Sequence, residues 1–333
     1  MTSIPNWDLR IFTRVLIFLL IGPMSAKTVL SSHHLPQIAF ASTRDGNAEI
    51  YVMASDGHNQ VRLTHHPAID IQPSWSPNGR KIAFVSNRNG GNIQIYLMDS
   101  NGRNLMRLTD GAWNQNPAWS PNGRQIAFES TAGESNLDIY VIGTDGRHRT
   151  RLTGAPRSNA MPAWSPDARR IAYASWLGGR SEIYVMDADG ENQTRLTHNL
   201  VNERELSWSP DGSEIAFASW DGEGTVISVI GADGENRKNL TEGIREGFSV
   251  RDSSPAWSPD GRWIAYGSVT LGLNEGKIYL MTSDGEHLKR LSNVHKGGDF
   301  DPDWYAAPGL AVSPAGNQLT IWGKLKNLAS NLR

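Results

Sequence analysis

The chain has 333 residues, a formal net charge of −2, an isoelectric point near 6.5 and no cysteine. This length is enough for a large hydrophobic core. The charge balance argues against a nucleic-acid partner, because proteins of that class present a basic surface. Without cysteine, the chain has no disulfide, no thiol nucleophile and no cysteine ligand for a metal.

The first 26 residues are typical of an export signal. Arg10 and Arg14 precede the short apolar run Val15–Gly22, and a small-residue exit follows that ends at Ala26. Such a run is too short to span a bilayer comfortably. We therefore expect cleavage after Ala26 and a periplasmic or secreted protein without a membrane span. The alternatives are an uncleaved anchor and a mis-assigned start.

A tryptophan recurs along the rest of the chain at intervals of 44, 45, 44, 49 and 47 residues. The six positions are Trp75, Trp119, Trp164, Trp208, Trp257 and Trp304. Each of the first five ends a predicted strand and is followed by a Ser-Pro-Asn/Asp-Gly turn, in which proline presets φ and glycine accepts the last turn position. Ala168 takes the glycine position in one copy. This substitution predicts a strained or differently shaped turn.

Three further strand patterns occur six times, once at residues 36–64 and once after each of the first five tryptophans. The second strand reads like Ile82 to Phe84, with alternating faces, and the third reads like Ile95 to Met98, apolar on both faces. The latter pattern is expected for a sheet packed between two others. An Asp-Gly or Asn-Gly pair then marks a hairpin, and a fourth strand ends like Arg107 to Thr109.

This period and strand content predict an all-β propeller over residues 36–305. The expected ring has six four-stranded blades. The first repeat lacks a tryptophan strand before it, so the C-terminal strand around Trp304 is expected to complete the first blade and close the ring. Residues 306–333 form a tail that resembles a degenerate half-repeat, and a seven-bladed ring is the alternative.

The phrase Pro-Ala-Trp-Ser-Pro-Asp-Gly-Arg, followed by Ile-Ala-Phe/Tyr, Ile-Tyr-Val-Met and Arg-Leu-Thr, resembles the TolB-like propeller repeat of bacteria. The resemblance covers residues 36–305. It implies the propeller fold and, by analogy with the Tol–Pal envelope system, a partner protein. TolB itself carries an α/β domain before its propeller, and only about ten residues separate Ala26 from the first predicted strand. We therefore expect a free-standing TolB-like propeller.

The candidate binding site lies five residues before each tryptophan, in the loops expected around the channel mouth. All six residues there are polar: Asp70, Asn114, Asn159, Glu203, Asp252 and Asp299. Glu205 and Asp301, three residues before their tryptophans, add two carboxylates. Crowded carboxylates favour a basic peptide or a hard cation such as calcium or magnesium. The alternative is a solvated polar rim, partly neutralised by Arg204 and Arg251.

Three weaker patterns occur elsewhere in the sequence. His65, His66, His198 and His295 follow fourth strands and would have to converge to bind a metal. Asp187 begins a pattern similar to a calcium loop, but His198 stands where glutamate is needed, which favours a hairpin. Trp113 is either a stacking platform in a channel-side loop or a packing residue.

These observations favour an exported, non-catalytic propeller that binds a protein or peptide partner at its polar channel mouth. No cofactor is expected beyond a possible divalent cation in the channel, and the protein is expected to be a monomer. The alternative function is a metal-dependent lyase or hydrolase acting on a carbohydrate. A third possibility is a purely structural propeller.

Overall fold

The computed structural model describes residues 36–305, apart from 133–135, 155, 178, 199–200, 221–222, 243, 246–247, 273–274 and 293–295. The expected signal segment 1–26 and the tail 306–333 lie outside the described residues. Within the described ranges, no helix is both long and apolar enough to cross a membrane.

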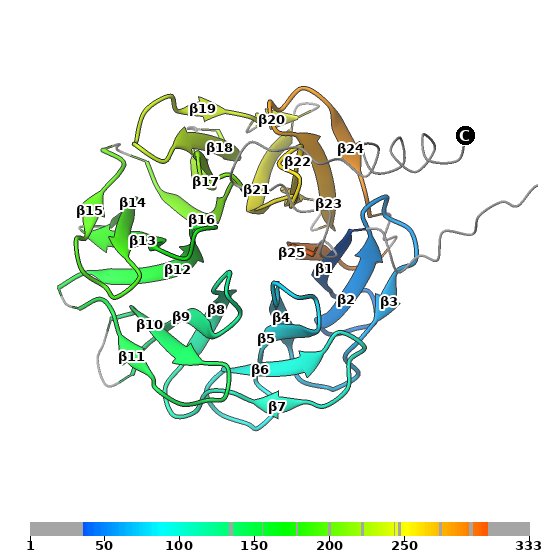
Figure 1. Cartoon of the computed structure of the whole chain (residues 1–333). Helices are drawn as coiled ribbons and strands as arrows, with labels where there is room; N and C mark the ends of the chain where they lie inside the picture. Colours follow the sequence, from blue (N-terminus) through cyan, green and yellow to red (C-terminus); the bar gives the residue numbers. More distant parts are fainter. Residues whose placement is uncertain are drawn as a thin grey trace, which may run out of the picture. The chain divides into compact units, whose positions relative to one another are not determined.

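The described chain is built from antiparallel sheets arranged in a ring, with the tryptophan-bearing strands innermost (Figure 1). Four sheets have four strands each. The first contains β25 (Asp299–Tyr305), β1 (Gln37–Ser42), β2 (Glu49–Ala54) and β3 (Val61–Arg62). The second contains β4 (Asp70–Trp75), β5 (Lys81–Ser86), β6 (Gln94–Asp99) and β7 (Met106–Arg107).

The third four-stranded sheet contains β8 (Asn114–Trp119), β9 (Gln125–Ser130), β10 (Asp138–Gly143) and β11 (Thr150–Arg151). The fourth contains β12 (Ser158–Trp164), β13 (Arg170–Leu177), β14 (Arg180–Asp187) and β15 (Thr194–Arg195). The last sheet has nine strands: β16 (Glu203–Trp208), β17 (Glu214–Trp220), β18 (Thr225–Gly231), β19 (Lys238–Asn239), β20 (Ile244–Arg245), β21 (Phe248–Trp257), β22 (Trp263–Thr270), β23 (Glu275–Thr282) and β24 (Leu288–Arg290).

The propeller architecture is confirmed, but the expected ring of six separate four-stranded blades is wrong, as is its seven-bladed alternative. The described residues form four four-stranded blades, and the repeats of Trp208 and Trp257 share the nine-stranded sheet. The longest interval between tryptophans separates these two repeats. The extra residues form β20 and lengthen β21, where Arg251 pairs in parallel with Thr225 of β18 and joins the two repeats.

The ring closes through the C-terminal strand. β25 pairs antiparallel with β1, with Trp304 opposite Ile38, and Asp299 opposite Ser42. β25 therefore takes the innermost position that the first repeat lacks. Because both edges of the ring are joined by backbone hydrogen bonds, neither is left exposed to pair with another chain.

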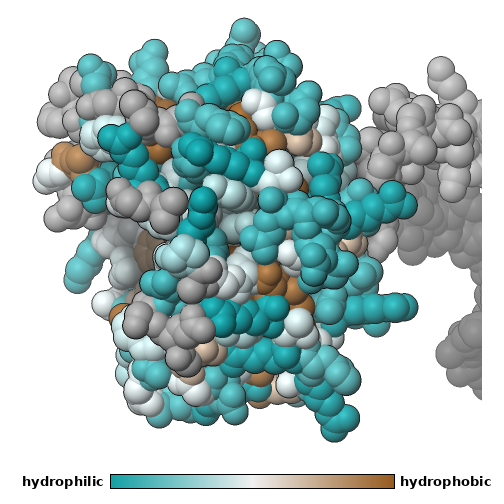
Figure 2. Space-filling view, turned by 90° about the vertical axis from the view of Figure 1, so that its left-hand side faces the viewer, coloured by the Kyte–Doolittle hydropathy of each residue, from teal (hydrophilic) through white to brown (hydrophobic). Residues whose placement is uncertain are grey.

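Apolar side chains from neighbouring sheets pack together and hold the ring. One cluster joins Val85 and Leu97 of the second sheet to Ile126 and Phe128 of the third. Fully burying side chains of this size contributes roughly 1.5–3 kcal/mol each. The outer side of the ring near β14 and β15 is mainly hydrophilic, with apolar residues at scattered positions (Figure 2). The sheets are thus held by the faces they present to one another.

The predicted turns after the tryptophan strands are present. In the second sheet the hydroxyl of Ser76 lies 2.9 Å from Oδ1 of Asn78, and the same oxygen accepts the backbone N–H of Arg80 at 3.0 Å. Gly79 has φ 65°, and a Cβ there would lie 2.0 Å from the ring of Tyr305. Ala168 has φ 60°, so the predicted strain at this turn is confirmed.

Candidate functional site

The six polar residues five positions before the tryptophans are buried. Their exposed fractions are 0% for Asp70, Asn114, Glu203, Asp252 and Asp299, and 3% for Asn159. Five of them begin or nearly begin their innermost strands, while Asp252 lies in the middle of the longer β21, and their side chains bond to groups of the sheets. None of these six is among the described residues that line the axial cavity. A ligand-binding role for them stays a prediction, and their contacts account for a structural role.

Arginines hold most of this buried ring. Arg88 pairs with Asp70 at 2.7 Å, and Arg44 pairs with Asp299 at 2.9 Å. Arg237 pairs with Glu203. Each guanidinium also lies over one or two aromatic rings of its repeat. That of Arg88 is 5.1 Å from the Phe84 ring and 5.0 Å from the Tyr96 ring. Such cation–π contacts help a charge to remain inside the fold.

The remaining members are held by hydrogen bonds with an arginine, an aspartate and a threonine. Arg149 donates to Asn114 at 3.1 Å, Asn159 donates to Asp138 at 3.2 Å, and Thr241 donates to Asp252 at 2.6 Å. Burial raises the pKa of Asp70, although its bonds to Ser86 and Arg88 oppose the shift. Sequence reasoning missed the arginines because they come from different places: Arg44 and Arg88 follow a second strand, while Arg149 and Arg237 precede a fourth strand.

The axial cavity has a volume of about 460 Å³ and is lined by the innermost strands and by prolines of the turns that follow them. Six lining residues stand three positions before the tryptophans: Gln72, Asn116, Met161, Glu205, Ser254 and Asp301. Of the residues named for the candidate site from the sequence, Glu205 and Asp301 belong to this axial ring. Five tryptophans also line the cavity, namely Trp75, Trp119, Trp164, Trp208 and Trp304.

Every member of the axial ring has an unusual backbone. Their φ values lie between 49° and 57°, in the left-handed region that non-glycine residues rarely adopt. The pairing register shifts at or beside each of them, as between Ile71 and Ser74 of β4. This β-bulge re-aims one residue in each innermost strand. Recurrence of the same strained conformation in six strands indicates that the fold requires it there.

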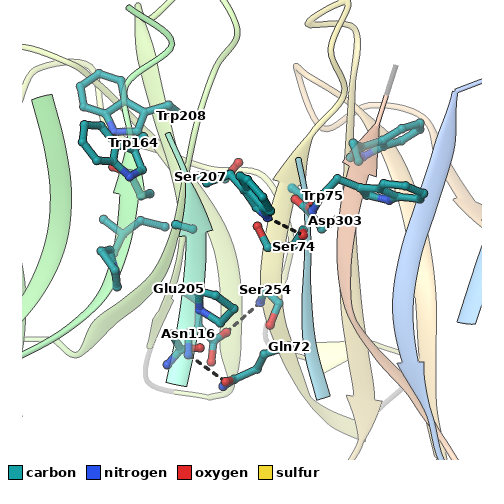
Figure 3. Close-up of a pocket in the computed structure, with 18 of the residues that line it drawn as sticks. Gln72, Ser74, Trp75, Asn116, Trp164, Glu205, Ser207, Trp208, Ser254 and Asp303 are labelled. Atoms are coloured by element: carbon teal, nitrogen blue, oxygen red, sulfur yellow. Dashed lines mark hydrogen bonds between the residues drawn. The ribbon is translucent and has the colours of Figure 1, made fainter. Parts of the chain in front are cut away.

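The bulges are linked by hydrogen bonds around the axis. The backbone N–H of Asn116 donates to Oε1 of Gln72 at 3.0 Å, and that of Ser254 donates to Oε2 of Glu205 at 2.7 Å (Figure 3). The N–H of Glu205 lies 3.3 Å from the sulfur of Met161. Each bond joins a side chain of one repeat to the bulged backbone of the next.

Two more connections complete the circle. Glu129 of β9 is 1% exposed, and it accepts the backbone N–H of Met161 at 2.7 Å and the side-chain amide of Gln115 at 2.5 Å. Asp301 accepts the Ser254 hydroxyl at 2.9 Å and a hydrogen bond from the backbone of Gln72. The last bond spans the junction between the C-terminal strand and the second sheet.

The cavity is acidic on one side. Glu205, Asp301 and Asp303 line it, and no lysine or arginine is among its described lining residues. Burial raises the pKa of Glu205, and the nearby Asp301 carboxylate adds to the rise while Arg204 opposes it. Burial also raises the pKa of Asp301. A cationic group in the cavity would interact favourably with these carboxylates.

Asp303 is a third carboxylate in the cavity with a raised pKa. Burial raises its pKa to about 7, while the backbone N–H groups of Trp75 and Trp304 hydrogen-bond it and limit the rise. The Trp75 N–H donates to Oδ2 of Asp303 at 2.6 Å. A group at this position changes its charge near neutral pH. The charge of the cavity, and its affinity for cations, should therefore depend on pH in that range.

The weaker predictions find no site. Among the described residues, no group of three or more His, Asp or Glu side chains is arranged to hold a metal ion. Nδ1 of His66 accepts the backbone N–H of Ala68, a loop contact, and His295 lies outside the described residues. Trp113 is 53% exposed, and its indole N–H donates to Asn92.

Comparison with known proteins agrees with the repeat pattern. The family model of the TolB beta propeller domain matches residues 32–134 and 111–308. The "Tol-Pal system protein TolB" of Geobacter sulfurreducens is 54% identical over 46 residues, which are 14% of this chain and 11% of that protein. The chain thus aligns with a small part of such curated relatives.

Two solved structures are similar in fold. TolB from Acinetobacter baumannii has a TM-score of 0.69 at 23% identity and covers 81% of this chain and 66% of its own. The putative TolB from Agrobacterium tumefaciens has a TM-score of 0.64 at 21% identity and covers 81% of this chain and 97% of its own. With the family model matched over most of its length, this chain belongs to the TolB beta propeller domain family.

Proposed function

We propose that this protein is a non-catalytic interaction module of the bacterial envelope, which binds a positively charged segment of a partner protein in its axial cavity. The observation that carries the proposal is the lining of that cavity. Three carboxylates face a volume of about 460 Å³ without a lysine or arginine among the described lining residues. A lysine or arginine side chain from a partner would compensate this charge.

The family and the leader sequence support the cellular setting. Relatives are named as Tol-Pal system proteins, and we extend that setting to this chain as part of the proposal. An export signal at residues 1–26 would deliver the propeller to the periplasm. No contact among the described residues favours the enzymatic alternative.

The cavity can accept a side chain without rebuilding its walls. The axial ring is fixed by the hydrogen bonds between Gln72 and Asn116 and between Glu205 and Ser254. A preformed site loses little conformational entropy when its ligand binds. The ligand's charge would lower the raised pKa values of the cavity carboxylates. Because the pKa of Asp303 is about 7, we expect binding to release protons and to strengthen as the pH rises from 6 to 8.

A labelled oligolysine peptide and its lysine-acetylated counterpart test the proposal by fluorescence anisotropy. We expect the oligolysine to bind and the acetylated peptide to bind weakly or not at all. In the double variant Glu205→Gln/Asp301→Asn the affinity should fall by about tenfold or more, since two close charge partners are lost. Both substitutions keep an oxygen acceptor for the bonds of Ser254.

The matched control is Asp70→Asn, which removes a carboxylate from the buried ring outside the cavity. It also reproduces the residue that another repeat carries at Asn114. This control should bind the peptide as the unchanged protein does. Equal affinity of the unchanged protein and the cavity double variant would refute the proposal.

A further inference from the structure

One face of the ring carries two turns from each of the five repeats that contain Trp75, Trp119, Trp164, Trp208 and Trp257. The turn after the tryptophan strand and the hairpin between the third and fourth strands lie side by side there. In the second sheet the backbone N–H of Ser100 donates to the carbonyl of Arg80 at 2.9 Å, and in the third sheet Thr144 donates to Arg124 at 3.1 Å. The prolines of the first turns also line the axial cavity. This turn face therefore surrounds the cavity.

The third residue of the first turn differs in charge between repeats, although its structural role is constant. Its side-chain oxygen accepts the turn hydroxyl and a backbone N–H, at 2.9 and 3.0 Å for Asn78 and at 2.7 and 3.0 Å for Asp211. The residue is asparagine at 78 and 122 and aspartate at 167, 211 and 260. Because either residue satisfies the turn, the fold does not dictate the charge.

The residue after the hairpin glycine divides the repeats in the same way. It is His58, Arg103 or Arg147 in the first three sheets, and Glu191, Glu235 or Glu286 in the next three repeats. All six are exposed. In each case the backbone N–H donates to the hairpin Asp or Asn, at 3.0 Å for both Arg103 and Glu235. Because the turn uses only the backbone N–H of this residue, it does not constrain the charge of the side chain.

Both positions thus separate the turn face into two sectors. The basic sector consists of the turns of the sheets that contain Trp75 and Trp119, where Arg80 and Arg124 add two exposed charges. The acidic sector consists of the turns in the repeats of Trp164, Trp208 and Trp257. Three cations lie within the acidic sector: Arg169, Arg262 and Lys238, whose ammonium group donates to the carbonyl of Asp284 at 2.7 Å. The three aspartates and three glutamates at the two turn positions outnumber them.

The axial ring shows the same division of charge between the two sides of the ring. Gln72 and Asn116, which are neutral, belong to the innermost strands of the basic sector. Glu205 lies on β16 in the acidic sector, and Ser254 of β21 links it to Asp301. One side of the molecule is therefore acidic from the rim of the turn face to the cavity wall.

We propose that the turn face binds a partner segment of opposite charge order, with its basic part over the acidic sector and its acidic part over the basic sector. This inference rests on the proposed function, because it states how the partner that fills the cavity is oriented. Exposed charges contribute little to affinity one by one. Separated sectors act together on the rate and the direction of approach.

Two labelled peptides of identical composition test the inference. In the block peptide, lysines fill one half and glutamates the other; in the alternating peptide, the two residues alternate. Anisotropy at low salt should show that the unchanged protein binds the block peptide about tenfold more tightly. The preference should disappear in Glu191→Gln/Glu235→Gln/Glu286→Gln and in Arg103→Gln/Arg147→Gln, and it should weaken with added salt.

The control Asp110→Asn removes an exposed carboxylate from a loop after a fourth strand and should keep the preference. Equal binding of the two peptides by the unchanged protein, or an unchanged preference in both sector variants, overturns the inference. The sector variants could keep the full preference for the block peptide while Glu205→Gln/Asp301→Asn loses oligolysine binding. That result would overturn the orientation by charged sectors and leave the proposed function standing. Analytical sedimentation tests whether the protein forms a dimer at low salt. A dimer that the sector variants abolish would show that the turn face binds a second copy of the chain, which would also overturn the inference.

Discussion

Two rings of residues, polar except for Met161, surround the axis two positions apart along the same strands, and they differ in what holds them. The outer ring, five residues before each tryptophan, is buried and bonded within the sheets, as in the pair of Arg88 with Asp70. The axial ring, three residues before, lines the cavity through β-bulges. Polarity alone therefore does not identify a binding position. The decisive difference is the register shift that turns one ring toward the axis.

The difference also explains why the charges behave differently. Asp70 and Asp299 have arginine partners that lie over aromatic rings. Glu205 and Asp301 instead bond to Ser254 and to backbone groups, and burial raises the pKa of both. The outer ring is compensated by the protein itself. In the axial ring Arg204 lies 3.6 Å from Glu205, and the proposed cationic ligand would compensate the remaining negative charge.

The largest effect should come from breaking an outer-ring ion pair. Arg88→Met leaves the fully buried Asp70 carboxylate without its charge partner, so we expect the free energy of unfolding to fall by about 3–5 kcal/mol. Urea denaturation measures this. The control Lys81→Met breaks the more exposed pair with Asp99 and should cost less than about 1 kcal/mol. Similar costs for the two variants would show that the outer ring is not structural.

A medium effect is expected at Asp303, where the pKa is raised to about 7 in the folded protein from an ordinary value of 3.8. As the pH rises, the carboxyl group loses its proton at a lower pH in the unfolded chain than in the folded protein. The free energy of unfolding therefore falls between about pH 4 and pH 7 and stays at the lower value above that range. Asp303→Asn keeps an oxygen for the Trp75 N–H and removes the charge. We expect it to raise the free energy of unfolding at pH 8 by about 2 kcal/mol, with a smaller gain at pH 5.

Asp99→Asn is a control of opposite sign for that experiment. The bonds of Asp99 to Lys81 and Asn104 lower its pKa, so removing its charge should destabilise the protein slightly at neutral pH. Urea denaturation at several pH values compares the two variants. A gain for Asp303→Asn that is the same at pH 5 and pH 8 would contradict titration of this group.

The smallest effect should come from one bond of the axial ring. Gln72→Ala removes the acceptor of the Asn116 N–H, which should cost about 1 kcal/mol and increase hydrogen exchange at that amide. Gln72→Glu keeps an acceptor and should retain the protection. It also adds a carboxylate to the cavity, so oligolysine should bind it more tightly. If the Asn116 amide exchanges at the same rate in Gln72→Ala as in the unchanged protein, the ring of hydrogen bonds is not continuous at this position.

The repeat pattern predicted most of the architecture. The propeller, the turn strain at Ala168 and the closure of the ring by the strand of Trp304 are all present. The number of separate blades was not predictable, because one parallel pairing between Thr225 and Arg251 merges two repeats. That pairing depends on how a longer connection packs against β18, and repeat spacing carries no information about this.

The sequence by itself determined the strand order, the turns and the spacing of polar residues from each tryptophan, because these follow from local backbone preferences and hydrophobic alternation. It also contains the division of charges between repeats on the turn face. Only the tertiary structure decided which polar ring faces the axis. A strict alternation of faces places residues 70 and 72 on the same side, whereas the bulge before Ser74 turns Gln72 into the cavity and leaves Asp70 buried beside Arg88.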